Sequence, residues 1–141
     1  MRAAQILVLT ALILTVAAKS APAHHSFAAE FDANKPFKFT GKVTEVKWMN
    51  PHTFFYLDVA DEKTGKVTNW GMEMGSPNIL MRSGWRRDTL KVGDVVTVEG
   101  SMAKDGSPTG NARTVVLAAS GKKLFAGSSQ GSTPQLPTSN E

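Results

Sequence analysis

Five stretches of the chain alternate apolar and polar residues with a period of two, which is the pattern of half-buried β-strands. In the first of these stretches the apolar parity changes between Val43 and Val46, and such a change requires a β-bulge. Gly41 lies nearby and eases the bend. The predicted strands are residues 37–48, 52–60, 67–74, 95–102 and 112–119.

Each of the middle strands has one strongly apolar face, which predicts the core. The opposite face of the second strand carries His52, Phe54 and Tyr56, and that of the third carries Glu73. We therefore expect Glu73 to point away from the core. The residues predicted to be buried are Phe55, Leu57, Trp70, Met72, Val96 and Val98.

A short helix is predicted between the third and fourth strands, at residues 77–83. Ser76 is a good N-cap, Pro77 suits the first helical position, and Gly84 suits the C-terminal end. Three strands, a helix and two strands form the order of the OB-fold, a five-stranded Greek-key barrel. We predict an OB-like all-β barrel with one short helix, and the alternative is a small β-sandwich.

The two ends of the chain have compositions unlike the strand region. Arg2, an apolar run over residues 6–18 and the sequence Ala21-Pro22-Ala23 predict a cleavable signal peptide at 1–23 and export to the periplasm. Residues 24–126 then form a single domain with an N-terminal arm anchored by Phe27 and Phe31. Residues 127–141 are rich in Gly, Ser, Thr and Pro and predict a disordered tail. No later stretch is long and apolar enough for a transmembrane segment after cleavage.

Charge and composition narrow the function classes. The formal charge of +4 falls to +2 once Arg2 and Lys19 leave with the signal, and this small charge predicts no nucleic-acid partner. The absence of cysteine excludes disulfides, thiolate metal sites and a thiol nucleophile. No known catalytic motif is present, so we do not expect an enzyme, although oxidative chemistry at a histidine-bound metal stays open.

The candidate chemistry lies in the three histidines. Cleavage after Ala23 makes His24 the new N-terminus, whose α-amine and imidazole can chelate one metal ion. His52, which follows Asn50-Pro51, can supply a third nitrogen, and His25 is a further possible ligand. A nitrogen-rich, tetragonal set suits Cu(II), so the predicted cofactor is copper and the predicted role is a copper carrier or buffer.

Other side chains are open to two interpretations. Glu73 can accept a hydrogen bond from a metal-bound histidine and so orient its ring, or it can be an ordinary strand glutamate. Met49 is a marginal ligand beside the histidine turn. Taken singly, each histidine is better explained as a mobile terminal residue or a strand-end residue, and it is their combination that indicates a metal site.

The alternative function is a metal-free periplasmic binding module. In this hypothesis Trp48, Tyr56 and Trp85 face a glycan, a lipid or another periplasmic protein. Copper binding by the processed protein separates the two hypotheses.

Several short motifs occur together in this chain: His24-His25-Ser26-Phe27, Trp48-Met49-Asn50-Pro51-His52, Trp70-Gly71-Met72-Glu73 and Leu90-Lys91-Val92-Gly93-Asp94. Over most of residues 24–121 the chain resembles a domain-of-unknown-function family of small exported proteins from Gram-negative bacteria. That resemblance implies export and the extent of the domain, but no activity. The terminal histidine is also similar to that of periplasmic copper-resistance proteins of the CopC type, which is a likeness of site alone.

Overall fold

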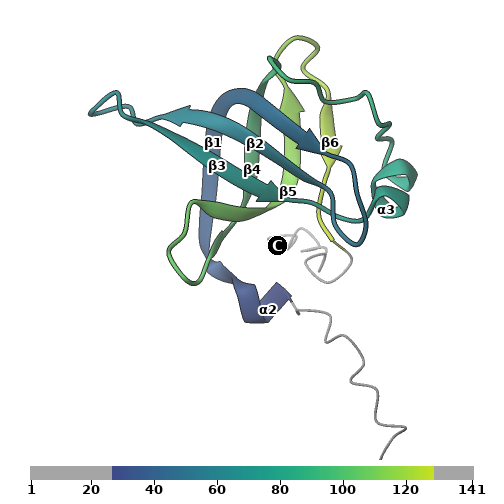
Figure 1. The fold of residues 1–141 in the computed structure, drawn as a ribbon, viewed down its shortest axis with the longest axis horizontal. Coiled ribbons are helices and arrows are strands. Elements are labelled where there is room, and N and C mark those ends of the chain that lie inside the picture. Colours follow the sequence, from purple (N-terminus) through teal and green to yellow (C-terminus); the bar gives the residue numbers. More distant parts are fainter. Residues whose placement is uncertain (1–26, 129–141) are drawn as a thin grey trace, which may run out of the picture.

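The computed structural model describes residues 27–128, which form a strongly curved β-sheet with two short helices (Figure 1). The strands correspond to the five predicted ones, with one additional short strand at the C-terminal end. In chain order the elements are α2 (Phe27–Glu30), β1 (Phe31–Lys47), β2 (Phe54–Ala60), β3 (Val67–Glu73), α3 (Pro77–Arg82), β4 (Val95–Ala103), β5 (Thr109–Leu117) and β6 (Lys123–Phe125).

The strand order confirms the OB-like prediction. The sheet runs β3-β2-β1-β4-β5-β6, and its neighbouring strands are antiparallel. A short parallel pairing between β3 and β5, from Gly71↔Thr109 to Glu73↔Asn111, closes the sheet on itself. Helix α3 lies between β3 and β4, as an OB-fold requires. The sixth strand was not predicted because its three residues are too short for a periodic signal.

The long first strand, β1, bends at the predicted bulge and so passes from one side of the barrel to the other. Its pairing with β2 shifts register between Val43 and Glu45. Gly41 faces the neighbouring strand so closely that a Cβ there would lie 2.4 Å from the carbonyl oxygen of Asp58. The bend therefore needs both an extra residue and a position without a side chain.

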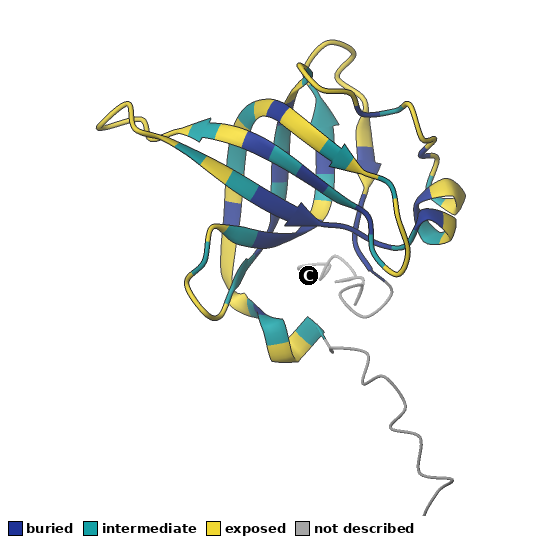
Figure 2. Ribbon diagram, viewed as in Figure 1, coloured by how far each residue is buried: buried dark blue, intermediate teal, exposed yellow. Residues whose placement is uncertain are grey.

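The core fills the barrel interior and the space under α3 (Figure 2). Phe55, Leu57, Met72, Val96 and Val98 are buried as predicted. Trp70 is not: it is half-buried, with its ring centroid 4.6 Å from that of Phe39. The alternation along β3 placed Trp70 on the inner face correctly, but this part of β3 runs outward toward the exposed hairpin at residues 61–66, where the interior no longer covers it.

Helix α3 forms where its capping residues predicted it. The Ser76 side chain accepts a hydrogen bond from the backbone N–H of Ile79, and Pro77 occupies the first turn. The helix ends at Arg82, and Gly84 has φ +89°, a conformation that glycine adopts without strain. Leu80 faces inward and is fully buried, which fixes the helix against the barrel.

The ends of the domain differ slightly from the prediction. The predicted arm is one turn of helix that leads directly into β1, which begins at Phe31 rather than at residue 37. Gly127 and Ser128, predicted to start the tail, are buried, and Gly75 N–H donates to the carbonyl of Ala126. The predicted signal peptide and the remainder of the tail lie outside residues 27–128. Within that range, no helix is long and apolar enough to cross a membrane.

Candidate functional site

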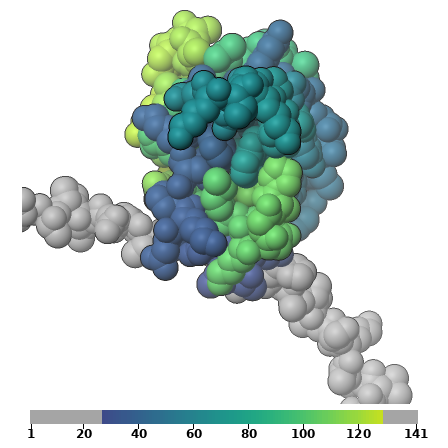
Figure 3. Space-filling view, turned by 90° about the vertical axis from the view of Figure 1, so that its left-hand side faces the viewer, coloured from purple at the N-terminus to yellow at the C-terminus, as the bar shows by residue number. Residues whose placement is uncertain are grey.

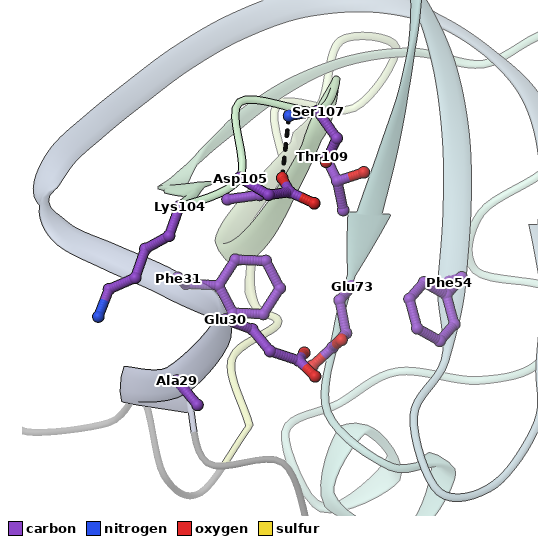
Figure 4. A pocket seen from close by; sticks show the side chains of 10 residues that line it. Ala29, Glu30, Phe31, Phe54, Glu73, Lys104, Asp105, Ser107 and Thr109 are labelled. Carbon is purple, nitrogen blue, oxygen red and sulfur yellow. Dashed lines mark hydrogen bonds between the residues drawn. The ribbon is translucent and has the colours of Figure 1, made fainter.

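A cleft of about 520 Å³ opens between the N-terminal arm, the ends of β2 and β3, and the loop that joins β4 to β5 (Figure 4). Its walls combine aromatic rings with carboxylates and hydroxyls. The side chains that line it are Ala29, Glu30, Phe31, Phe54, Glu73, Ala103, Lys104, Asp105, Ser107 and Thr109. A cleft of this size and mixed lining is typical of a small-molecule site.

The arm forms one wall of the cleft because Lys104 holds it to the β4–β5 loop. The backbone N–H of Lys104 donates to the carbonyl of Glu30 at 2.9 Å, and its ammonium group donates to the carbonyl of Ala28. Phe31 pairs with Ala103 across β1 and β4 and is 4% exposed. The Phe27 ring packs against it with centroids 5.7 Å apart. In the space-filling view the green 104–110 segment lies directly beside the blue start of β1 (Figure 3).

A histidine–carboxylate pair borders the cleft through Glu73. His52 Nδ1 is 2.9 Å from Glu73 Oε1, and the amide group of Asn111 approaches the same oxygen at 3.5 Å. The parallel β3–β5 pairing places Asn111 opposite Glu73, so barrel closure itself brings the amide to the carboxylate. Glu73 is 7% exposed, whereas the His52 side chain is one-third exposed.

This contact determines which nitrogen of His52 is available. An ionised carboxylate only accepts hydrogen bonds, so Nδ1 must carry the proton that it donates to Glu73. In the neutral imidazole, Nε2 then keeps its lone pair. Carboxylate-bound histidines of this kind are the usual arrangement at protein metal sites, where the carboxylate orients the ring and raises its basicity. The pair can therefore bind a metal ion or accept a proton through Nε2.

The β4–β5 loop adds a negative charge to the other side of the cleft. Asp105 accepts a hydrogen bond from the backbone N–H of Ser107 at 2.9 Å, and the hydrogen bonds from Ser107 lower the pKa of this carboxyl below its ordinary value. Gly106 has φ +78°, which completes the tight turn. Asp105 is thus ionised at neutral pH and fixed in orientation.

Eight candidate site residues were predicted from the sequence, and six of them lie within residues 27–128. His52 and Glu73 lie together. Glu73 was expected on a solvent-facing surface and is instead buried, because Asn111 covers it from β5 and it lines the base of the cleft. Met49 is half-exposed and does not line the cleft.

The three aromatics of the alternative hypothesis do not form a common surface. Trp48 is half-buried against the core, and Tyr56 lies on the outer face of β2 with Lys47 Nζ 4.7 Å from its ring centroid. Trp85 is 2% exposed, and its indole N–H donates to the carbonyl of Phe125 at 2.7 Å. Because the Trp85 ring belongs to the buried core cluster, its contact with a ligand stays a prediction.

His24 and His25 lie outside the described residues, so their approach to His52 stays a prediction. Within residues 27–128, the side chains of His, Asp and Glu form no group of three suited to a metal ion. Sequence reasoning missed the cleft residues Glu30, Phe54 and Asp105, and it missed Asn111, which contacts Glu73. Phe54 and Glu73 are opposite one another across β2 and β3, and counting outward from the 61–66 turn would have found that pair.

A solved structure gives one point of comparison. The crystal structure of the mitochondrial single-stranded DNA binding protein Rim1 from S. cerevisiae aligns with a TM-score of 0.47 and 10% identity, over 60% of this chain and 93% of that one. The expectation that nucleic acid is no partner is corrected here, because this similar structure is described as a single-stranded DNA binding protein.

Comparison by sequence assigns the chain to a family but gives it no function. No curated protein matches the chain. A family model described as a family of unknown function, DUF6152, matches residues 11–112. That match spans β1 to β4, the His52–Glu73 pair and all of the residues that line the cleft. The chain belongs to the DUF6152 family.

Proposed function

We propose that the mature protein is exported to the periplasm and binds Cu(II) through the terminal His24 and through His52, as a carrier or buffer. The observation that carries the proposal is the 2.9 Å contact between His52 Nδ1 and Glu73 Oε1. It leaves Nε2 as a nitrogen donor on a partly exposed ring, and it supplies the oriented carboxylate that metal-binding histidines require.

The length of the chain supports the pairing with His24. Phe27 begins the arm that borders the cleft, and His24 precedes it by three residues. Three extended residues span at most about 11 Å, so the proposed terminus cannot lie far from this side of the barrel. The arm and Glu73 border the same cleft, and Glu73 contacts His52.

The donor set explains the choice of metal. The α-amine and imidazole of His24, with Nε2 of His52, provide three nitrogen ligands. Such sets favour the tetragonal geometry of Cu(II), which also binds nitrogen ligands more tightly than zinc. The carboxylate of Glu73 adds negative charge behind the His52 ring and favours a bound cation.

Copper titration of three forms of the protein tests the proposal. We expect stoichiometric Cu(II) binding by protein that starts at His24, with an electron paramagnetic resonance spectrum typical of nitrogen ligands. The His52→Ala variant and a form with one alanine added before His24 should each bind Cu(II) far more weakly. The first loses an imidazole, and the second converts the α-amine into an amide.

Thermal unfolding is the control for both forms. A side chain that is one-third exposed contributes little packing, so His52→Ala should keep the fold. The alanine extension leaves every described residue unchanged. Copper affinity that is the same in all three forms overturns the proposal.

The metal-free binding module is the second candidate function, and the cleft is the observation that favours it. Its aromatic lining comes from Phe31 and Phe54 rather than from the three aromatics that sequence analysis named. Ligand binding by protein stripped of metal, with no response to copper, favours this second candidate.

A further inference from the structure

The helical turn α2 is too short to fix its own position. It has four residues, Phe27–Glu30, whereas isolated helices shorter than about 12 residues are already marginal in water. None of its four residues is buried, so burial does not hold it either. Contacts from the rest of the domain therefore decide where α2 lies, and with it the point at which the preceding chain reaches the barrel.

Lys104, in the β4–β5 loop, makes two of these contacts. Its backbone N–H donates to the carbonyl of Glu30 at 2.9 Å, and its ammonium group donates to the carbonyl of Ala28. The last carbonyls of a helix have no partner within the helix, and a lysine side chain is a suitable donor for them. A single residue of the loop thus satisfies two carbonyls of α2 and holds the turn against the barrel.

The turn that Lys104 holds lies beside the histidine–carboxylate pair. Glu30, at the end of α2, and Glu73, at the end of β3, line the same cleft, and their carboxylates lie next to one another in Figure 4. Glu73 Oε1 is in turn 2.9 Å from His52 Nδ1. In the same view the Lys104 ammonium group points away from these carboxylates, so the contact between Lys104 and the pair runs through α2.

We infer, on the basis of the proposed function, that Lys104 is the positioning residue of the copper site. Its hydrogen bonds to α2 keep the terminal His24 within reach of His52. Lys104 itself does not bind the metal. It lowers the entropy that is lost when ligands from two separate segments meet at one ion, which is the usual gain from preorganisation.

Replacing Lys104 by Met separates this role from the stability of the fold. The variant loses the ammonium group but keeps the backbone N–H that donates to Glu30. Phe31, which is 4% exposed, still pairs with Ala103, so β1 stays in place. Only the part of the arm before Glu30 gains freedom, and thermal unfolding should change little because the Lys104 side chain is exposed.

Competition titration of the processed Lys104→Met variant with Cu(II) is the test. We expect an affinity about three- to fivefold lower than that of the wild type, the size that the loss of one exposed charged contact implies. The electron paramagnetic resonance spectrum should shift toward that of His52→Ala, because the two histidines meet at the metal less often. Lys104→Arg, which keeps a donor for the carbonyl of Ala28, should restore both the affinity and the spectrum.

A double variant distinguishes positioning from a general effect of charge. In the His52→Ala background, Lys104→Met should cause no further loss of affinity, because the arm then has no imidazole to meet. Lys63→Met is the matched control. Lys63 is also an exposed lysine in a turn, but it lies in the β2–β3 hairpin away from the arm, so its replacement should leave copper affinity unchanged.

The outcomes for the two proposals differ. A wild type that binds no Cu(II), or that binds it equally well after His52→Ala, overturns the proposed function and with it this role of Lys104. A wild type that binds Cu(II) as proposed leaves Lys104 to be judged alone. Its role is overturned by an unchanged affinity in Lys104→Met, by an equal loss in Lys63→Met, or by a further loss when Lys104→Met is added to His52→Ala.

Discussion

The His52 imidazole meets the Glu73 carboxylate diagonally across the open end of the β2–β3 hairpin, at 2.9 Å between Nδ1 and Oε1. Phe54 is directly opposite Glu73, and the backbone ladder continues through Thr53, which bonds to Met74 and Gly75. His52 therefore lies on the same face as Phe54 and Glu73, one diagonal step farther along. The contact follows from strand register.

Replacing Glu73 by Gln should weaken Cu(II) binding by about tenfold, the usual cost of losing a carboxylate behind a metal-bound histidine. Glutamine has similar size and can still accept from His52 Nδ1–H, so only the charge is lost. Calorimetric titration of the processed protein measures the effect.

Glu99→Gln is the control for that variant. Glu99 is also a strand glutamate with a hydroxyl hydrogen bond, from Thr114, but it lies on β4 beside Lys38. Its replacement should leave copper affinity unchanged. Equal losses in both variants would show a general charge effect and contradict the role of Glu73.

Protein recovered from the periplasm should begin at His24. The expectation follows from the apolar run at residues 6–18 and from Ala21-Pro22-Ala23. Intact-mass spectrometry measures the terminus. A start at any other residue removes the α-amine ligand and with it the chelate on which the copper proposal depends.

Trp85→Phe should lower the free energy of unfolding by about 1–3 kcal/mol. The variant leaves the carbonyl of Phe125 without its indole N–H donor and leaves space where the larger ring was packed. Urea unfolding measures the loss. Trp48→Phe is the comparison, and because Trp48 is only half-buried its cost should be smaller.

Ionised Glu99 should stabilise the barrel, and this stabilisation should be lost in acid. Its ion pair with Lys38, at 3.1 Å, is the main cause that lowers its pKa below the ordinary value of 4.5, and the hydrogen bond from Thr114 adds to it. The folded state thus holds the ionised form, and this stabilisation is present above about pH 4.5 and is lost as the pH falls through the lowered pKa.

Thermal unfolding measured from pH 7 to pH 3 tests whether the stability that Glu99 contributes falls on acidification. At pH 7, Glu99→Gln should be less stable than the wild type by no more than about 0.5 kcal/mol, because the pair is partly exposed and screened. The difference should shrink below about pH 4.5 and disappear at the acid end. A difference that grows on acidification would contradict the assignment.

The sequence by itself determined the strands, their inward faces and the helix. Alternation placed Phe55, Leu57 and Met72 inside, Ser76 and Pro77 started α3, and the parity change in β1 required the bulge. These features depend on residues close together in the chain, whose spacing reports directly which side is buried. The order of such elements was then enough to identify an OB-like barrel.

Tertiary structure alone decided which of these residues share a site. Asn111 reaches Glu73 only because β3 and β5 close the barrel, and Glu30 joins the cleft only because Lys104 holds the arm. The same long-range packing buried Trp85 and Glu73, both expected at the surface, and left Trp70 half-exposed. Periodicity along one strand shows which face a side chain occupies, but whether a neighbouring segment covers that face depends on contacts between residues far apart in the chain.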